Sequence, residues 1–183
     1  MRKLENSELN RMNVEQFHES EKVPMVVVLD NIRSRHNIGS VFRTSDAFRL
    51  EKICLCGITA TPPDREIQKS ALDATLSVKW EYFPDAEIAI EKLKNAGYKI
   101  YLVEQTDDSI PVHEFIPDFG NGIVLVFGNE VNGVDEKLLQ YADACVEIPQ
   151  YGTKHSLNVS VSAGIMIWAL FEKYRISRNF NNI

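Results

Sequence analysis

The sequence predicts an α/β fold in which a mostly parallel sheet is flanked by helices. From Pro24 onward, short apolar runs alternate with stretches of helical periodicity, which is typical of strand–helix units. Two of these runs, VVVL at 26–29 and IVLVF at 123–127, are continuous rather than alternating, as expected of strands buried on both faces of a parallel sheet. A length of 183 residues suits one domain with its own core.

The elements follow in order along the chain. The first 22 residues are polar, with short helical potential at 7–12 and 14–21, where Asn13 and Gln16 resemble a capping box. Strands are expected at Met25–Leu29, Lys52–Gly57, Tyr98–Val103, Gly122–Phe127 and Ala144–Ile148, with a weaker one at Val78–Tyr82. Helices are expected at Asn37–Arg49, Arg65–Ala74, Asp85–Ala96, Asp135–Tyr141 and Ser156–Arg175. We therefore divide the chain into an N-terminal extension (1–23), one domain (24–175) and a C-terminal tail (176–183).

Composition narrows the class of protein. The net charge of −6 argues against a general nucleic-acid-binding protein. The longest apolar run, at 163–171, is about half of the ~20 residues that a membrane span needs, and the N-terminus has no apolar signal region. The three cysteines form neither a paired framework nor a CxxC motif, which favours a reducing compartment. We expect a soluble, cytoplasmic protein that uses no membrane.

Charge is spread unevenly along the chain. Residues 31–49 carry four arginines against one aspartate, and residues 148–183 carry four basic residues against one glutamate. Residues 84–147 hold thirteen acidic residues against four lysines. A phosphate-bearing partner would be met by the first and last of these segments together, although uneven charge is also common on solvated faces.

Ligands bind at the carboxyl ends of parallel strands, so the loops after the strands are the candidates for a site. The first such loop enters a helix that Asn37 could cap, with Ile38 and Phe42 one turn apart on its buried face. Gly39 lies four residues before Arg43 and would leave open space beside the guanidinium, which suits an anionic ligand. The spacing alone favours a simpler interpretation, in which Arg43 is a surface residue and Gly39 accommodates a neighbouring strand.

The second loop, GNEVNGV at 128–134, follows a buried strand. Its glycines and asparagines permit positive φ and a close backbone approach to a ligand. Glu130 stands at the exit of that strand, where an acid is costly without a partner. An ordinary turn punctuated by Asn132-Gly133 is the alternative, and it is less favoured because a plain turn needs no acid.

The third loop, at 148–162, leads into the most apolar helix of the chain, which Ser156 could cap. Close helix packing explains Ser160 and Ser162. Asn158 is a polar amide early in a buried helix, so we expect it to have a specific partner.

Several other motifs are absent. The sequence has no GxGxxG after its first strand and no GxxxxGK[ST]. It also lacks GxSxG, so the adjacent His155 and Ser156 are weak evidence for a hydrolase. The histidines have no metal-like spacing, and Cys54 and Cys56 would share one strand face as small core residues. No metal site is indicated.

Taken together, the three loops resemble the SpoU (TrmH-like) branch of the SPOUT RNA 2′-O-methyltransferases. The match lies in N-x-G-x-x-x-R at Asn37, Gly39 and Arg43, in G-N-E at 128–130, and in I-P at 148–149 followed by S-L-N-V-S at 156–160. It covers roughly residues 24–175. The resemblance implies a C-terminal trefoil knot, a homodimer, and S-adenosylmethionine bound mostly by backbone groups. The implied cofactor contacts are Gly128, Ile148 and Leu157, with Thr106 as a weaker candidate.

The reaction that the resemblance implies is in-line attack of a ribose 2′-oxygen on the sulfonium methyl group. Arg43 would face the cofactor of the other subunit, either as the proton acceptor or as a clamp for the adjacent phosphate and the oxyanion. We prefer the clamp, because arginine is ordinarily always protonated. The supporting residues implied are Asn37 and Glu130, which would hold the arginine, and Ser156 and Asn158, which would position the ribose and the third loop.

The expected partner is RNA, with tRNA ahead of rRNA, and no DNA is expected. Gln150 departs from the methionine that many relatives carry after I-P, which bears little on a backbone contact. We expect no separate RNA-binding domain, so that the N-terminal extension and the tail would be left to contact a larger RNA. The alternatives are a non-catalytic RNA-binding or assembly protein on the same fold, a base methyltransferase, and a hydrolase using His155 and Ser156.

Overall fold

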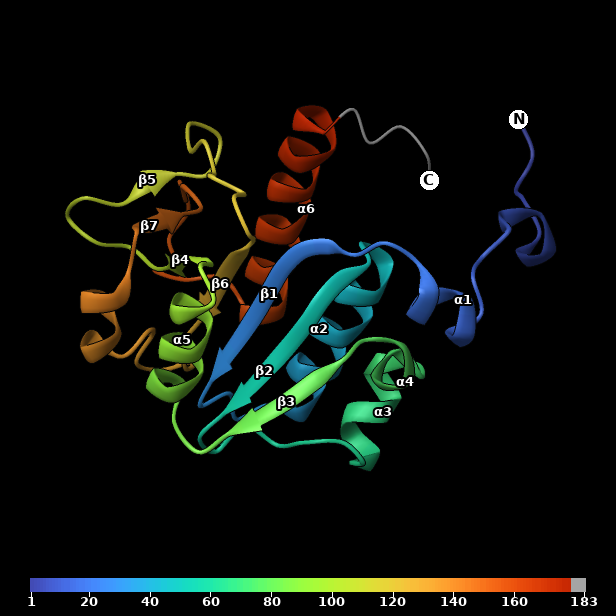
Figure 1. Ribbon diagram of the computed structural model, residues 1–183, viewed down its shortest axis with the longest axis horizontal. Helices are drawn as coiled ribbons and strands as arrows, with labels where there is room; N and C mark the ends of the chain where they lie inside the picture. Colours follow the sequence, from blue (N-terminus) through green and yellow to red (C-terminus); the bar gives the residue numbers. More distant parts are fainter. Residues whose placement is uncertain (179–183) are drawn as a thin grey trace.

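Seven strands form one sheet in which every pair of neighbouring strands is parallel. They are β1 (Val23–Asp30), β2 (Leu50–Cys56), β3 (Trp80–Phe83), β4 (Lys99–Val103), β5 (Ile110–Pro111), β6 (Ile123–Phe127) and β7 (Ala144–Glu147). Their order in the sheet is β3-β2-β1-β6-β4-β7-β5, with β1 and β6 near the centre (Figure 1). The computed structural model describes residues 1–178 of the chain.

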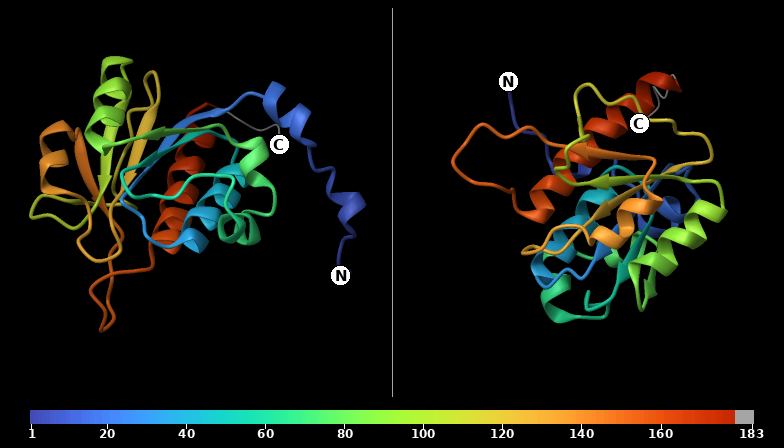
Figure 2. Two further views of the ribbon diagram at one scale, coloured as in Figure 1. Left: turned by 90° about the horizontal axis from the view of Figure 1, so that it is seen from below. Right: turned by 90° about the vertical axis from the view of Figure 1, so that its left-hand side faces the viewer.

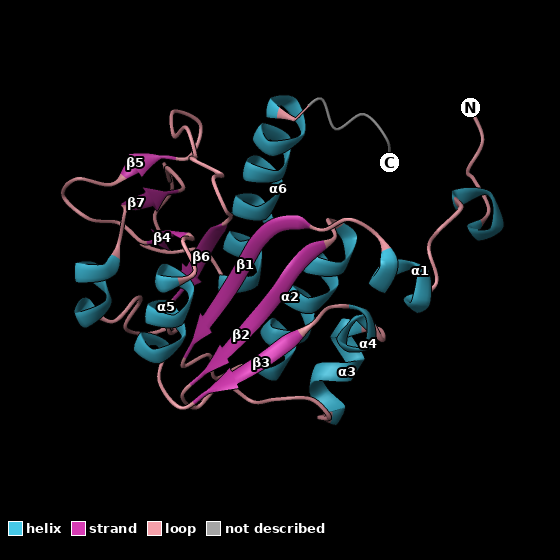
Figure 3. Ribbon diagram, viewed as in Figure 1, coloured by secondary structure: helices cyan, strands magenta, loops and turns pink. Residues whose placement is uncertain are grey.

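Helices cover both faces of the sheet (Figure 3). The α-helices are α1 (Val14–Glu19), α2 (Arg35–Ala47), α3 (Arg65–Ala71), α4 (Ala74–Ser77), α5 (Ala86–Asn95) and α6 (Val159–Ser177), and the 3₁₀ helices are η1 (Asn6–Leu9) and η2 (Glu136–Tyr141). Helices α2 and α6 pack on one face, whereas α5 and η2 pack on the other (Figure 2).

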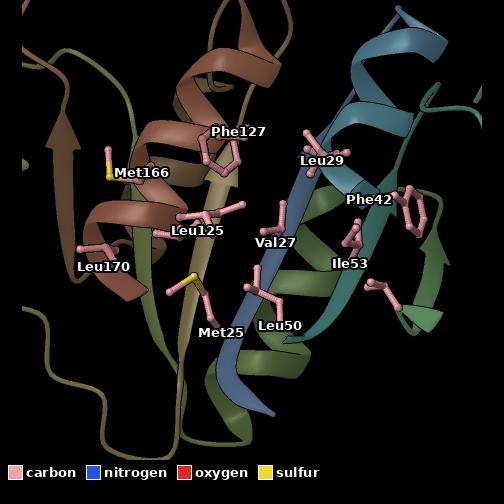
Figure 4. Close-up of a cluster of buried hydrophobic side chains, with 14 of the residues drawn as sticks. Met25, Val27, Leu29, Phe42, Leu50, Ile53, Leu125, Phe127, Met166 and Leu170 are labelled. Carbon is pink, nitrogen blue, oxygen red and sulfur yellow. The ribbon is translucent and has the colours of Figure 1, made fainter. Parts of the chain in front are cut away.

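The core lies in two layers because successive side chains of a strand point to opposite faces. On β1, Val27 and Leu29 face α2 and α6, and Val26 and Val28 face α5; all four are fully buried. Figure 4 shows the larger layer, in which Phe127 of β6 lies with side chains of β1 and α6. The continuous apolar runs of the sequence are thus explained by burial on both faces. Cys54 and Cys56 are buried in the second layer, as predicted.

The predicted strands and helices are present with small shifts, apart from four differences. The predicted helix 65–74 is divided into α3 and α4 because Leu72 and Asp73 adopt left-handed conformations, with φ of 49° and 67°. The helix predicted at 135–141 is a 3₁₀ helix. Strand β5 was not expected, since two residues carry no periodicity. The 3₁₀ helix η1 is shorter than the helical potential at 7–12.

Two helix caps differ from the prediction. Ser34, not Asn37, caps α2 by accepting a hydrogen bond from the Asn37 N–H at 3.3 Å. Asn158, not Ser156, caps α6 by accepting one from the Ser160 N–H at 2.9 Å. In both cases another polar residue close in sequence takes the capping position. The side chain of Asn37 is therefore available for contacts outside its own helix.

The N-terminal extension is less detached than its polar sequence suggests. The capping box of Asn13 and Gln16 is present, with bonds of 3.0 and 2.8 Å. Phe17 of α1 is only 5% exposed and joins the main core, and His18 contacts the Leu76 carbonyl at 3.0 Å. The division at residue 23 stays a prediction. Most of the predicted tail, residues 179–183, lies outside the described residues, and α6 continues through Ser177.

The topology brings the post-strand loops together. Strands β1, β6, β4 and β7 are adjacent, so the segments that follow them meet at one edge of the sheet. The segment after β7 extends away from the body before α6 begins (Figure 2). The predicted threading of this segment through a knot stays a prediction. In the described part of the chain, no helix combines the length and apolar character that crossing a membrane requires.

Candidate active site

Glu130 is the centre of the polar cluster at this edge. Its Oε2 accepts the backbone N–H of Arg33 at 3.0 Å, and its Oε1 accepts the backbone N–H of Ser34 at 3.1 Å. Oε1 also accepts the side-chain amide of Asn37 at 3.2 Å. The carboxylate therefore ties the second loop to the start of α2, where the unpaired N–H groups and the helix dipole favour a negative charge.

These contacts set the ionisation of Glu130. Burial acts to raise its pKa, but the hydrogen bonds from the backbone of Arg33 and Ser34 and from Asn37 outweigh burial. The pKa of Glu130 is consequently below its ordinary value, and the group is an anion at neutral pH. The sequence argument that an acid here needs partners is confirmed by these bonds.

Asn158 brings the third loop to the same cluster. Its Nδ2 donates to Oδ1 of Asn37 at 3.2 Å, while its own Oδ1 accepts from the backbone and hydroxyl of Ser160. The specific partner predicted for Asn158 is thus Asn37. Glu130, Asn37 and Asn158 form a continuous chain of hydrogen bonds from three loops that are far apart in sequence.

Arg43 lies elsewhere on the surface. It is exposed, and it lines a shallow depression together with Ser40, Thr44 and Phe48. Six residues separate it from Asn37, which on an α-helix means about 9 Å of rise and a different face. Within the described residues of one chain, no hydrogen bond or ion pair holds its guanidinium, so the expectation that Asn37 and Glu130 hold Arg43 stays a prediction.

Two glycines are crowded by neighbouring segments: Gly39 accommodates a neighbouring element, as the favoured interpretation held, but that element is helix α3 and not a strand, and the cofactor contact of Gly128 stays a prediction. Gly39 does not leave open space: a Cβ there would overlap the Ile67 carbonyl oxygen and the Ser70 hydroxyl of α3. Gly128 is crowded by its own loop, because a Cβ there would overlap the backbone of Gly133. Both glycines permit close approach of protein segments, and neither contact is visible from the sequence pattern.

The second and third loops, together with the segment that follows β4, line a cavity of about 730 Å³ beside the polar cluster. Of the predicted site residues, those in its wall are Gly128, Ile148, Leu157, Thr106, Glu130, Ser156 and Asn158. Asn37 and Arg43 are outside the wall. The volume is within the range of small-molecule sites, roughly 300–1,000 Å³. Several other wall residues had been given no role from the sequence; among them are Asn129, which stands inside the G-N-E motif, and Glu104.

The charge of the cavity wall indicates what it can hold. The acidic residues of the described wall are Glu104, Glu130, Glu136 and Glu147, and none of its residues is lysine or arginine. Such a wall disfavours a phosphate and favours a cation, which fits the sulfonium and amino groups of S-adenosylmethionine. The described residues contain no group of three His, Cys, Asp or Glu side chains placed to bind a metal ion.

Comparison with known proteins identifies the family that the three sequence motifs resemble. Residues 24–168 match the model of the SpoU rRNA Methylase family. A tRNA (guanosine(18)-2′-O)-methyltransferase of Aquifex aeolicus is 31% identical over 153 residues, covering 82% of this chain and 70% of that protein. One of Thermus thermophilus is 30% identical over 174 residues, covering 93% and 84%. An S-adenosylmethionine-bound rRNA methyltransferase structure from Sinorhizobium meliloti has a TM-score of 0.75 and 26% identity, covering 86% of this chain and 57% of that one.

The fold and the site define an S-adenosylmethionine-dependent methyltransferase of the SPOUT class. Within that class the chain belongs to the SpoU rRNA methylase family, the branch that its three motifs predict. It is an RNA ribose 2′-O-methyltransferase, and the non-catalytic alternative is not supported. A hydrolase is not supported either, since no hydrogen bond joins His155 to Ser156 in the described chain.

Proposed function

We propose that this enzyme methylates a ribose 2′-hydroxyl of tRNA as a homodimer, and that each active site combines the cavity of one subunit with Arg43 of the other. The observation that carries the proposal is the position of Arg43. The arginine of the first motif is exposed and lies outside the cavity wall, so one chain alone holds the two parts of the site apart. A second copy supplies the missing arginine.

An apolar stripe beside Arg43 supports the dimer. Val161, Ile165 and Trp168 follow one face of α6 at helical spacing and are 49%, 38% and 51% exposed. The Trp168 ring packs against Phe48, at 5.6 Å between centroids, and Phe48 also lines the depression around Arg43. A second copy that covers this stripe would bury three large side chains and place Arg43 at the subunit boundary.

Unpaired cations near the polar cluster suit an RNA backbone. Arg35 pairs with Asp64 at 2.9 Å, so its charge is already used. The side chains of Arg33 and Lys154 are exposed, and in the described structure neither has a hydrogen-bond or ion-pair partner. Arg33 adjoins Glu130 through its backbone, and Lys154 lies in the projecting third loop. These side chains would hold phosphates outside the acidic cavity, with an affinity that weakens in salt.

The chain's own residues have distinct tasks in the reaction. S-adenosylmethionine, when bound, supplies the electrophilic methyl group, and its contacts would come from Gly128, Ile148, Leu157 and Thr106. Arg43 would clamp the phosphate next to the target ribose and stabilise the negative charge that develops on the 2′-oxygen as its proton passes to water and the oxygen takes the methyl group. The Glu130–Asn37–Asn158 chain would fix the start of α2 against the third loop, so that Ser156 faces the ribose in a set geometry.

Support for tRNA comes from relatives. The Aquifex and Thermus proteins are named as tRNA guanosine(18) enzymes, whereas the Sinorhizobium protein is an rRNA methyltransferase. Ribosomal RNA is therefore the competing substrate. The three free cysteines, all buried, support a cytoplasmic location.

Mixed dimers test the shared site. The Arg43→Ala protein keeps its cavity, and a Gly128→Val protein keeps its arginine but loses the cavity. We expect each alone to be inactive and a refolded equal mixture to regain about a quarter of the wild-type rate, because about half of the statistical dimers are mixed and each of these has one complete site out of two. An inactive mixture of properly folded dimers would overturn the shared site. Mass-spectrometric mapping of 2′-O-methylated nucleotides in a deletion strain would identify the RNA.

A further inference from the structure

Asn129 connects the second loop to the end of β1. Its Nδ2 donates to the backbone carbonyl oxygen of Asn31 at 2.7 Å, across 98 residues of sequence. This is a second tie between that loop and the β1–α2 connection, separate from the contacts of Glu130. Asn129 stands inside the G-N-E motif, but the sequence suggested no role for it, although it did for Gly128 and Glu130 on either side.

The acceptor is itself firmly held. Asn31 has a φ of 55°, and its backbone N–H donates to the Cys56 carbonyl at 3.1 Å. Its side chain donates to the carboxylate of Asp30 at 2.8 Å and accepts the Ile58 N–H at 3.1 Å. Asp30 is only 4% exposed. The carbonyl that receives Asn129 is therefore fixed by the ends of β1 and β2, which makes it a rigid anchor.

The other end of the amide shapes the loop. The Oδ1 of Asn129 accepts the N–H groups of Val131 at 2.9 Å and Asn132 at 3.3 Å. The backbone of Asn129 also pairs with Gly133, whose N–H donates to its carbonyl at 2.9 Å. One side chain thus closes the turn with its oxygen and attaches the closed turn to the sheet with its nitrogen.

We infer that Asn129 is a positioning residue for the cofactor: its amide holds the turn 129–133 against β1, so that the cavity wall is formed before the cofactor binds. The inference rests on the proposed placement of S-adenosylmethionine in this cavity. Because Glu130 follows directly, the same bond also sets the reach of its carboxylate toward Arg33 and Ser34.

Substitution by aspartate separates the two functions of the amide. Aspartate keeps Oδ1 for the turn, but an ionised carboxylate has no donor for the Asn31 carbonyl, whereas a protonated one has an O–H. The titratable groups around this position are Asp30 behind Asn31, Glu130 in the same turn, Glu104, which accepts the Val134 N–H at 2.9 Å, and His155 in the cavity wall. The surrounding carboxylates favour protonation of the new acid as the pH falls.

The experiment measures the Kd of S-adenosylmethionine by calorimetry at pH 8.0 and pH 5.5, together with the melting temperature without ligand. Asn129→Ala and Asn129→Asp should each weaken binding about tenfold at pH 8.0, equivalent to about 1.4 kcal/mol. At pH 5.5 the aspartate variant should return to within about threefold of wild type, and the alanine variant should not. Asn121→Ala is the matched control, because Asn121 precedes the same strand at its other end and should bind like wild type.

The outcomes are distinct. Variants that bind within twofold of wild type at pH 8.0 would overturn the inference, as would an aspartate variant that stays equally weak at both pH values. If wild type itself fails to bind S-adenosylmethionine, the proposed cofactor site is wrong. If the aspartate variant fails to fold, the alanine variant against the Asn121→Ala control still decides whether the side chain contributes.

Discussion

The side-chain amide of Asn158 donates to the side-chain oxygen of Asn37 at 3.2 Å, joining the start of α6 to the first turn of α2 across 121 residues. Asn37 in turn donates to Glu130. The three sequence motifs therefore contact one another directly through polar side chains. Arg43 takes no part in this chain of hydrogen bonds. Glu130, Asn37 and Asn158 therefore hold the loops together, whereas the Arg43 side chain is left for contacts outside the subunit.

Arg43→Ala should remove catalysis and leave the rest of the protein unchanged. The side chain is exposed and lies outside the cavity wall, so we expect the melting temperature and the Kd of S-adenosylmethionine to match wild type. The rate of methyl transfer should fall by at least about a hundredfold, as when an oxyanion-stabilising donor is removed. Arg43→Lys keeps the charge but loses the planar fork, and it should recover little of the rate. Near-normal turnover in both variants would contradict a chemical role for Arg43.

Gly39→Ala should destabilise the protein although alanine favours helices. The new methyl group would overlap the Ile67 carbonyl, which is backbone and moves only with α3. We expect a loss of about 1–3 kcal/mol, seen as a melting temperature several degrees lower. Gly152→Ala is the control: no atom lies within 4 Å of the added methyl group, so this change before α6 should alter stability by no more than about 0.5 kcal/mol. Equal effects of the two substitutions would contradict the close packing of α2 on α3.

Glu130→Gln should reduce stability near neutral pH and not in acid. The folded-state pKa of Glu130 is lowered, so its contribution is present above the unfolded pKa of about 4.3 and is lost as the pH falls through the folded value. Glutamine has one oxygen to accept the three N–H groups that the two carboxylate oxygens of Glu130 accept, so at least one of these hydrogen bonds is weakened or lost. Because the group is partly exposed, we expect a loss of only about 1 kcal/mol at pH 7. Chemical denaturation of wild type and variant at pH 7 and pH 3 measures the difference in their free energies of unfolding. The same difference at both pH values would contradict a stabilising role for the ionised Glu130 carboxylate.

Asp30→Asn should stabilise the protein near neutral pH, in contrast to Glu130→Gln. Burial, with Asp135 and Asp85 nearby, raises the pKa of Asp30 to about 6. An acid with a raised folded-state pKa destabilises the fold as the pH increases from its unfolded value through its folded one. The variant should therefore gain stability relative to wild type between pH 4.5 and pH 7.5, by about 1–3 kcal/mol. Melting curves across this pH range show whether the variant gains stability relative to wild type as the pH rises. A gain seen only at low pH would contradict the raised pKa of Asp30.

The sequence predicted the sheet well because burial on both faces leaves a direct trace, as in residues 26–29 and 123–127. It also predicted that Glu130 and Asn158 need partners, since a polar group near a buried element must be paired. Which residue caps a helix was harder, because Ser34 and Asn37 are both good caps and only the tertiary partner of Asn37 distinguishes them. For Gly39 the sequence favoured a close neighbour but named a strand, because nothing local shows that the neighbour is α3, about thirty residues later.

The place of β1 in the sheet has a consequence for how the protein folds. This strand pairs on one side with β6, so that Met25 lies opposite Ile123. Bringing Met25 and Ile123 together costs conformational entropy before their strands can form stabilising contacts. Proteins dominated by such long-range pairings fold in roughly milliseconds to seconds. The cavity wall needs this pairing and also the segment after β7. Cofactor affinity therefore requires that both distant segments are in place, and the return of S-adenosylmethionine binding during refolding would report when the pairing of β1 with β6 is complete.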